Sequence, residues 1–427
     1  MGLTERASWA RGDSRVAMIA GSQLRRCPTP SENPATTSTG WLRAALGLVS
    51  VLVLALGPMP GHTQEVVEID DRITCPTCVI ESGAPVTLAP PTGHVWFRSV
   101  PTPGLVRDSK GNYVMFPVEG DALIGVFGAD GRYLSSYGRI GEGPGEFAAG
   151  FGRLLTIGEG DVLYAIARPH LHMLAPRADS SLDRIRVPVD ARDVTVLKNG
   201  TIAVQSTVRT EAGITTIQIL RPDGKIEASI APAATNDEQW DEWKALSQNQ
   251  YMVRWDMGRV LGRSSDHMDV WSAHRNRYRI SRYGRDGVEK IRIDRIAKWF
   301  QPHFHGTPGA PSRGFAKTSV AGIHEDADGL LWVAVLRAPS SSSATLAELA
   351  PAGVEVRMDP YMDMSQFLHT TVEVLDPMAG ELVARHEFDE YARFVDTPGD
   401  DVFMYSLRAD ALGNIECTIR PLKLRRE

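Results

Sequence analysis

Arginine recurs at one position of a repeated pattern in this sequence. It stands at or just beyond the end of five short apolar segments, YAIAR, QSTVR, WSAHR, VAVLR and MYSLR. These residues are Arg168, Arg209, Arg275, Arg337 and Arg408, and Arg139 lies in the glycine-rich stretch GRIGEGPGEF. Guanidinium groups that converge in a desolvated opening suit bidentate binding of carboxylate or phosphate. The pattern predicts an anion-binding ring, and ion pairs between neighbouring repeats are the alternative interpretation.

Histidines provide a second set of candidate ligands. They lie in the stretches PHLH and PHFH and at the end of WSAH, and they are His170, His303, His305 and His274. Neutral imidazoles from different repeats could hold Zn²⁺, as in a metal-dependent hydrolase or lyase. No acid is positioned nearby as an obvious general base, and no G-x-S-x-G nucleophile motif occurs. Packing or surface positions are the alternative for these histidines.

The motif CPTC contains Cys75 and Cys78. A haem c site needs His after the second cysteine, where Val79 stands, and a zinc ribbon needs a second CxxC, which is absent. The following VIESGAPVTLAPP lacks the helical pattern of a thioredoxin-like site. In an oxidising compartment the pair is predicted to form a disulfide, which leaves Cys417 as a buried free thiol.

The elements that position these residues come from an internal repeat. A turn followed by a short apolar strand occurs at 108–116, 158–166, 197–205, 265–273, 326–334 and 397–405. A second hairpin follows the first five, at 127–134, 174–182, 220–227, 283–290 and 375–383. Four short strands cannot form a stable domain alone, so six units predict an all-β, six-bladed β-propeller of four-stranded antiparallel blades. The sixth unit ends one strand short, and an N-terminal strand, with 94–100 as the candidate, is expected to close it.

The repeated D-x-x-G-x-hydrophobic and x-x-D-G turns, with GRIGEGPGEF between the first two units, resemble NHL-type and TolB-like six-bladed propellers. The resemblance covers residues 94–424 and implies the same circular fold. GRIGEGPGEF lacks the helix start and the lysine or serine of a phosphate-binding loop. It is therefore predicted to be a crossing between two blades, where glycines adopt positive φ angles at little cost.

Blade topology assigns the connections to two faces. With strands labelled A to D outward, the A–B and C–D hairpins share one face, and the B–C loops and D-to-A crossings share the other. The long insertions 233–262, 296–322 and 337–371 all fall on the second, loop-rich face. This predicts a cap over the axis, because a rigid scaffold positions functional loops. The alternative is that insertions accumulated on this face without a function, because surface loops tolerate added length.

The N-terminal region differs from the repeats. An apolar run at 44–57 follows Arg43 and is too short for a comfortable membrane span, which predicts a signal peptide over 1–63 with a long n-region. An uncleaved anchor is the alternative. The segment 64–93 carries the CxxC, and 94–427 is the predicted propeller. Cleavage would remove six arginines and three acids and change the net charge from −6 to −9, which disfavours nucleic acid as a partner.

These observations predict a periplasmic or extracellular monomer that binds without catalysis and without a cofactor. Its partner is expected to be a protein or a small anionic ligand at the loop-rich face, with no membrane contact beyond an uncleaved anchor. The alternative is a propeller hydrolase or lyase that uses Zn or Ca. The two differ in their demands, since an enzyme needs convergent metal ligands or an acid–base pair, whereas a binding protein needs only a shaped, desolvated patch.

Overall fold

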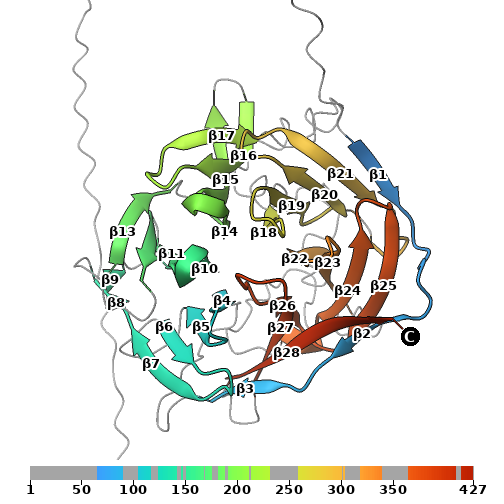
Figure 1. The fold of residues 1–427 in the computed structure, drawn as a ribbon, viewed down its shortest axis with the longest axis horizontal. Coiled ribbons are helices and arrows are strands. Elements are labelled where there is room, and N and C mark those ends of the chain that lie inside the picture. Colours follow the sequence, from blue (N-terminus) through green and yellow to red (C-terminus); the bar gives the residue numbers. More distant parts are fainter. Residues whose placement is uncertain are drawn as a thin grey trace, which may run out of the picture. The chain divides into compact units, whose positions relative to one another are not determined.

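The computed structural model describes residues 65–89, 104–116, 124–141, 146–147, 151–167, 169–175, 181–187, 191–210, 213–230, 258–300, 302, 318–338, 364–409 and 415–426. All belong to the compact unit His62–Glu427. They form six β-sheets around a common axis (Figure 1), which confirms the predicted six-bladed propeller. None of the helices within these ranges has the length and apolar character to cross a membrane. The predicted signal peptide and the candidate strand 94–100 lie outside the described residues.

The first three blades follow each other along the chain. Blade I contains β4 (Gly104–Arg107), β5 (Tyr113–Phe116), β6 (Ile124–Phe127) and β7 (Tyr133–Tyr137). Blade II contains β10 (Phe151–Ile157), β11 (Leu163–Ala167), β12 (His170–Leu174) and β13 (Ser181–Arg186). Blade III contains β14 (Asp193–Val196), β15 (Ile202–Thr210), β16 (Gly213–Leu220) and β17 (Ile226–Ile230).

The other three blades complete the ring. Blade IV contains β18 (Arg259–Arg263), β19 (Val270–His274), β20 (Arg279–Tyr283) and β21 (Glu289–Arg295). Blade V contains β22 (Ser319–Glu325), β23 (Leu331–Arg337), β24 (His369–Asp376) and β25 (Glu381–Phe388). Blade VI contains β26 (Ala392–Phe394), β27 (Val402–Ala409) and β28 (Ile415–Arg426). Short 3-10 turns occur at η1 (Glu159–Asp161), η2 (Lys198–Gly200) and η3 (Met364–Gln366).

The D-x-x-G motif forms the A–B hairpin in blades I and V. In blade I the carboxylate of Asp108 accepts hydrogen bonds from the backbone N–H groups of Lys110 and Asn112, at 3.0 and 2.7 Å. Gly111 follows with φ +83°, a conformation that costs other residues energy. Asp326 binds Asp328 N and Leu330 N in the same way in blade V. The two turns are thus held by the same hydrogen bonds from backbone N–H groups to an aspartate. Because these bonds are local, the turn is visible as a short motif in the sequence.

All A–B and C–D hairpins lie on one face of the ring, called here the hairpin face, because every blade has the same strand order. The described ends of the long connections, 230 and 258, 300 and 318, and 338 and 364, belong to D-to-A crossings or to a B–C loop. They therefore open onto the opposite, loop-rich face, as predicted. The first two insertions end sooner than expected, because β18 begins at Arg259 and β22 at Ser319.

The apolar core lies between neighbouring blades. One cluster joins blades I and II around Phe116, Phe147 and Ile157, and another joins blades IV and V around Trp271 and Val333. All five side chains are almost completely buried. Each blade thus covers its apolar faces with its neighbours, so the ring must close to protect the first and last blades.

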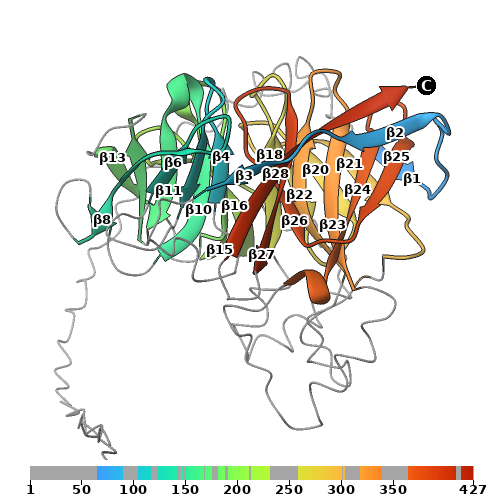
Figure 2. The ribbon, with the colours of Figure 1, turned by 90° about the horizontal axis from the view of Figure 1, so that it is seen from below.

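Residues 65–89, the N-terminal strap, run along the outside of the ring (Figures 1 and 2). β1 (Glu65–Ile69) pairs in parallel with β21 of blade IV, and Ile73 forms a bridge to Leu382 of blade V. β2 (Cys78–Ser82) and β3 (Val86–Leu88) pair with β28 of blade VI. The last blade is therefore closed by an N-terminal strand, as predicted; the strands that pair with it in the described residues are β2 and β3, so the sheets begin within the predicted separate segment 64–93.

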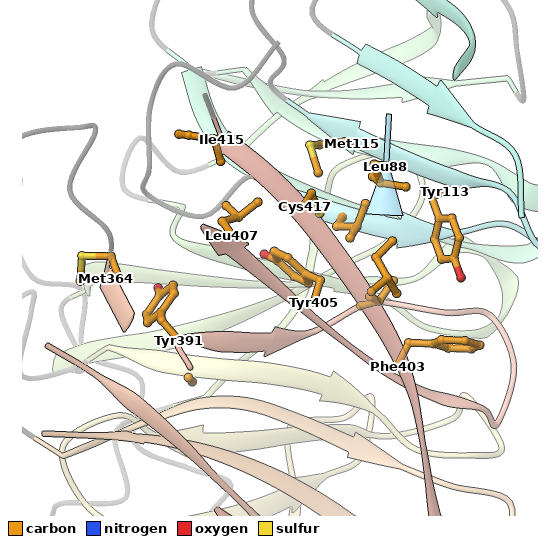
Figure 3. Close-up of a cluster of buried hydrophobic side chains, with 14 of the residues drawn as sticks. Leu88, Tyr113, Met115, Met364, Tyr391, Phe403, Tyr405, Leu407, Ile415 and Cys417 are labelled. Carbon is orange, nitrogen blue, oxygen red and sulfur yellow. The ribbon is translucent and has the colours of Figure 1, made fainter. Parts of the chain in front are cut away.

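Side chains of the strap enter the core. Leu88 is 1% exposed and packs with Met115 of blade I and Cys417 of blade VI (Figure 3). Asp71 accepts hydrogen bonds from Arg295 of blade IV at 2.8 Å and from Arg385 of blade V at 2.6 Å. The strap thus contacts four of the six blades through both apolar and charged groups.

The predicted disulfide between Cys75 and Cys78 is confirmed, and Cys417 is a buried free cysteine. The bond joins the part of the strap on blade V to β2. A disulfide that closes so short a loop stabilises the folded state by about 2 kcal/mol. The double variant Cys75→Ser/Cys78→Ser is expected to lose about this free energy of unfolding in urea titrations. Reductant should lower the stability of the wild type to that of the variant and leave the variant unchanged, and equal stability of both oxidised proteins would contradict the expectation.

The stretch GRIGEGPGEF is a blade crossing, as predicted. Its described residues form the parallel pair β8 (Arg139–Ile140) and β9 (Glu146–Phe147) between blades I and II. Gly138 has φ +77°, and a Cβ there would lie 2.6 Å from the ring of Phe147. Phe147 is 1% exposed and packs on Phe116. The glycine lets the chain pass close to the ring that anchors the crossing.

Candidate functional site: the loop-rich end of the axis

At the hairpin face, side chains cross the axis. Arg263, at the end of β18 in blade IV, donates to Asp396 of blade VI at 2.7 Å and to the carbonyl of Ile157 in blade II at 2.5 Å. Asp396 also accepts from Thr156 Oγ1 at 2.5 Å. Blades II, IV and VI alternate around the ring, so one residue can join all three only across the axis. This end is therefore occupied by a structural ion pair.

Four residues gather at the loop-rich end, where A strands begin and B strands end. Asp193 begins β14 of blade III, Arg275 follows β19 of blade IV, and Tyr391 and Arg393 lie at the start of β26 in blade VI. We call these four residues the axial cluster. Blades III and VI are opposite each other in the ring, so the electrostatic interaction between Asp193 and Arg393 acts across the axis. Protein atoms surround three of these side chains closely, those of Asp193, Arg275 and Arg393. Part of the surface of each residue is still accessible to solvent.

The electrostatics of the axial cluster favour an added anion. Burial lowers the pKa of Arg275 to about 10, with a further contribution from the charge of Arg393, while Asp193 opposes the shift. Burial raises the pKa of Asp193, although Arg275 and two backbone N–H groups stabilise its charge. One of these N–H groups is that of Leu261, at 2.9 Å. A single enclosed carboxylate therefore faces two guanidinium groups.

The side chain of Arg275 makes no hydrogen bond or ion pair with any residue in the described ranges. Arg393 donates its Nε to the hydroxyl of Tyr391 at 3.1 Å and lies over the same ring. Within the described part of the chain, no acceptor takes up the side-chain donors of Arg275. A partly exposed, enclosed guanidinium of this kind can form two parallel hydrogen bonds with a carboxylate or a phosphate.

The other predicted arginines have different surroundings. Arg139 pairs with Glu146 at 2.6 Å, Arg337 with Glu387 at 2.7 Å, and Arg408 with Glu390 at 3.3 Å. Arg168 lies outside the described residues, and for Arg209 the structure describes only the backbone, in β15. Of the six predicted arginines, the structure thus brings Arg275 to the axial cluster and shows acidic partners for three.

The candidate histidines do not form a metal site within the described ranges, where no group of three His, Cys, Asp or Glu side chains could hold a metal ion. His303 and His305 lie outside those ranges. His274 is 2% exposed in β19. His170 lies beside His172, with 6.2 Å between the ring centres, and His172 packs against Phe147 at 4.9 Å.

His172 predicts a pH dependence of stability. Burial, with the nearby charges of His170 and Arg184, lowers its pKa to about 4 from an ordinary 6.5. The unfolded chain binds the proton first as the pH falls, so stability is full above about pH 6.5 and declines towards pH 4, by roughly 2–3 kcal/mol. His172→Phe keeps a ring against Phe147 and should remove this part of the slope in urea titrations from pH 7 to 4. An unchanged slope in the variant would refute the assignment.

Asp193, Tyr391 and Arg393 were not among the predicted site residues. Each lies at the start of an A strand, next to the axis, whereas the arginine pattern follows the ends of B strands. The first residues of the A strands differ from blade to blade and form no repeat in the sequence. The signal that could have identified these three residues is the predicted position of the A strands, which are the innermost strands of the blades.

Comparison with known proteins supports the fold. No family model matches the chain, and no curated protein matches it. A crystal structure of a member of the DUF4221 family from Bacteroides vulgatus matches with a TM-score of 0.53 and 8% identity, covering 82% of this chain and 99% of that one. A candidate exported protein from Bacteroides fragilis matches with a TM-score of 0.50 and 9% identity, over 84% and 99% of the two chains. At these identities the chain is similar to both in fold, that of a six-bladed β-propeller, and the NHL-type or TolB-like relationship stays a prediction.

Proposed function

We propose that this protein is an exported, noncatalytic binding protein that takes a small anionic ligand at the loop-rich end of its axis. The observation that carries the proposal is Arg275, an enclosed and partly exposed guanidinium with no side-chain partner among the described residues. Arg393 adds a second positive charge, and Asp193 and Tyr391 supply polar groups that can orient the ligand. Arg168 and Arg209 remain predicted contributors from blades II and III.

The direction from which a ligand can reach the axial cluster supports this location. The hairpin end of the axis is occupied by Arg263 and Asp396, so a ligand reaches the axial cluster from the loop-rich face. The long connections 233–262, 296–322 and 337–371 begin and end on this face, and such loops provide contacts for a protein partner as well as for a small ligand. The predicted signal peptide and the exported character of the similar Bacteroides fragilis protein support a periplasmic or extracellular location.

Isothermal titration calorimetry with sodium succinate, citrate and phosphate at constant ionic strength tests the proposal. Arg275→Met should weaken binding of the preferred anion about 10- to 100-fold, because a charge-assisted hydrogen bond contributes about 1.5–3 kcal/mol. Arg221→Met is the matched control, since Arg221 pairs with Asp223 on the hairpin face, and it should leave the affinity unchanged. Equal affinities of Arg275→Met and the wild type, or no binding of any probe, would contradict the proposal.

A further inference from the structure

Arg259 is a buried cation without a side-chain partner among the residues that the structure describes. It begins β18, only 4% of its surface is exposed, and its Nε is fully enclosed with no acceptor. No side-chain hydrogen bond or ion pair joins it to another residue in the described part of the chain. Arg263 and Arg295 are similarly buried in the same blade, but both hold carboxylates, those of Asp396 and Glu373. Arg259 thus differs from Arg263 and Arg295, and resembles Arg275, in having no carboxylate partner among the described residues.

Gln205 lies in the same region and also lacks partners. It is 0% exposed in β15, and neither its Oε1 nor its Nε2 makes a hydrogen bond. Side chains alternate along a strand, so Gln205 shares the face of Ala203, and Arg259 shares the face of Leu261. Ala203 and Leu261 pack in one cluster between blades III and IV. Gln205 and Arg259 therefore face the same interface from its two sides.

The charges around Arg259 leave it uncompensated. Burial lowers the pKa of Arg259 to about 10; Tyr283 opposes this shift, and the charges of Arg279 and Arg277 add to it. Glu289 favours the charged form more weakly, and it also binds Arg292 at 2.6 Å. A water molecule could satisfy the carboxamide of Gln205, but it could not neutralise a buried guanidinium. An anion can neutralise the guanidinium and also accept a hydrogen bond from the Nε2 of Gln205, because guanidinium and carboxamide N–H groups are donors, whereas Oε1 needs a separate donor such as water.

We propose that the interface between blades III and IV contains a second anion site, in which Arg259 and Gln205 hold a small oxyanion such as a carboxylate or a phosphate. The charged guanidinium of Arg259 neutralises the anion, and the Nε2 of Gln205 donates a hydrogen bond to it. The site goes beyond the proposed function, because it uses no residue of the axial cluster and is expected whether or not that cluster binds a ligand.

The test uses Arg259→Met, which replaces the cation by an apolar side chain. It is introduced into the variant Arg275→Met, in which the axial cluster no longer contributes to anion binding, and the single and double variants are compared. Thermal unfolding of the full chain is measured in sodium chloride, acetate and phosphate at equal ionic strength. In Arg275→Met, acetate or phosphate should raise Tm above its value in chloride, because a ligand that binds only the folded state stabilises it. The double variant Arg275→Met/Arg259→Met should show no such rise, and the anion with the larger rise distinguishes carboxylate from phosphate.

A second readout separates an anion site from a structural role. In chloride alone, Arg259→Met should be at least as stable as the wild type, because it removes an unpaired buried charge. Arg279→Met is the matched control: Arg279 pairs with Asp294 at 2.5 Å, so this variant should lose stability but keep the rise in Tm with the anion.

Several outcomes would overturn the second site. These are no rise in Arg275→Met, the same rise in the double variant, or a marked loss of Tm in Arg259→Met in chloride. If the wild type shows the rise and Arg275→Met abolishes it, the anion binds only at the axial cluster. In that case the proposed function stands and the second site fails.

Discussion

Replacing Glu373 by glutamine is expected to lower the free energy of unfolding by about 3–5 kcal/mol, the range for removing one partner of a buried ion pair. Glu373 is completely buried in β24 and accepts hydrogen bonds from Arg295 at 2.8 Å, Arg385 at 2.7 Å and the hydroxyl of Tyr278 at 2.6 Å. Glutamine keeps the shape but removes the charge. Arg295, whose side chain is 0% exposed, would then share only Asp71 with Arg385.

The loss should appear in urea titrations as a lower midpoint with an unchanged slope, because the folded structure is retained. Glu387→Gln is the matched control. Glu387 also pairs with an arginine of the same blade, Arg337, but its side chain is 51% exposed, so the change should be below about 1 kcal/mol. Similar small losses in both variants would show that the buried network contributes no more than a surface ion pair.

Asp71 connects this buried network to the N-terminal strap. Burial raises the pKa of Asp71, but hydrogen bonds from the backbone N–H of Lys298 and from Arg295 and Arg385 outweigh it and lower this pKa to about 2. A carboxylate with a lowered pKa stabilises the fold above about pH 4 and loses this contribution as the pH falls towards 2. The strap therefore supplies the second negative charge for two arginines of blades IV and V. Without the strap, these blades would hold two cations and one anion.

The blades could be predicted from the sequence because the information is local. Each hairpin is specified within about nine residues by its turn residues, and in several turns an aspartate accepts backbone N–H groups and a glycine has positive φ, as at Asp108 and Gly111. Strand order and the identity of the loop-rich face then follow from repetition. Six copies of a turn followed by a short apolar strand fix the number of blades even where the strands are short.

The strap could not be predicted, because its contacts are distant in sequence. Glu65 pairs with Ile291, and Cys78 with Arg426. β1, with the sequence EVVEI, reads equally well as a strand or as part of a linker, and no motif indicates a parallel pair at the edge of blade IV. The same holds for closure by β2, since several N-terminal segments have a strand-like composition and only packing selects one.

The candidate site was predicted in part, for a related reason. The position of Arg275 after a B strand selected it as a candidate, because that position recurs in the repeat. The same pattern also selected Arg337 and Arg408, which have acidic partners at Glu387 and Glu390. The sequence pattern predicts at which end of a strand, and so on which face of the ring, an arginine lies. Whether its charge is paired with an acid depends on residues that are distant in sequence.

Asp396→Asn is expected to lower the free energy of unfolding by about 2–4 kcal/mol and to loosen the hairpin end of the axis. The carboxylate of Asp396 accepts from Arg263 at 2.7 Å, Thr156 Oγ1 at 2.5 Å and the backbone N–H of Ile157 at 3.2 Å. The amide keeps one oxygen but loses the charge that compensates Arg263, whose side chain is 8% exposed. Blades II, IV and VI then lose their common charged contact.

Hydrogen exchange can localise this effect. Amides near Ile157, Arg263 and Thr397 should exchange faster in Asp396→Asn, by more than those of the loop-rich ends of the same blades, because local opening near the lost contact becomes easier. Asp130→Asn is the matched control, since Asp130 pairs with Arg132 at 3.4 Å in an exposed hairpin of blade I, and its loss should stay below about 1 kcal/mol. Uniform acceleration over the whole ring would mean that Asp396 stabilises only the global fold, and unchanged exchange would mean that the axis is held closed by the backbone of the A strands alone.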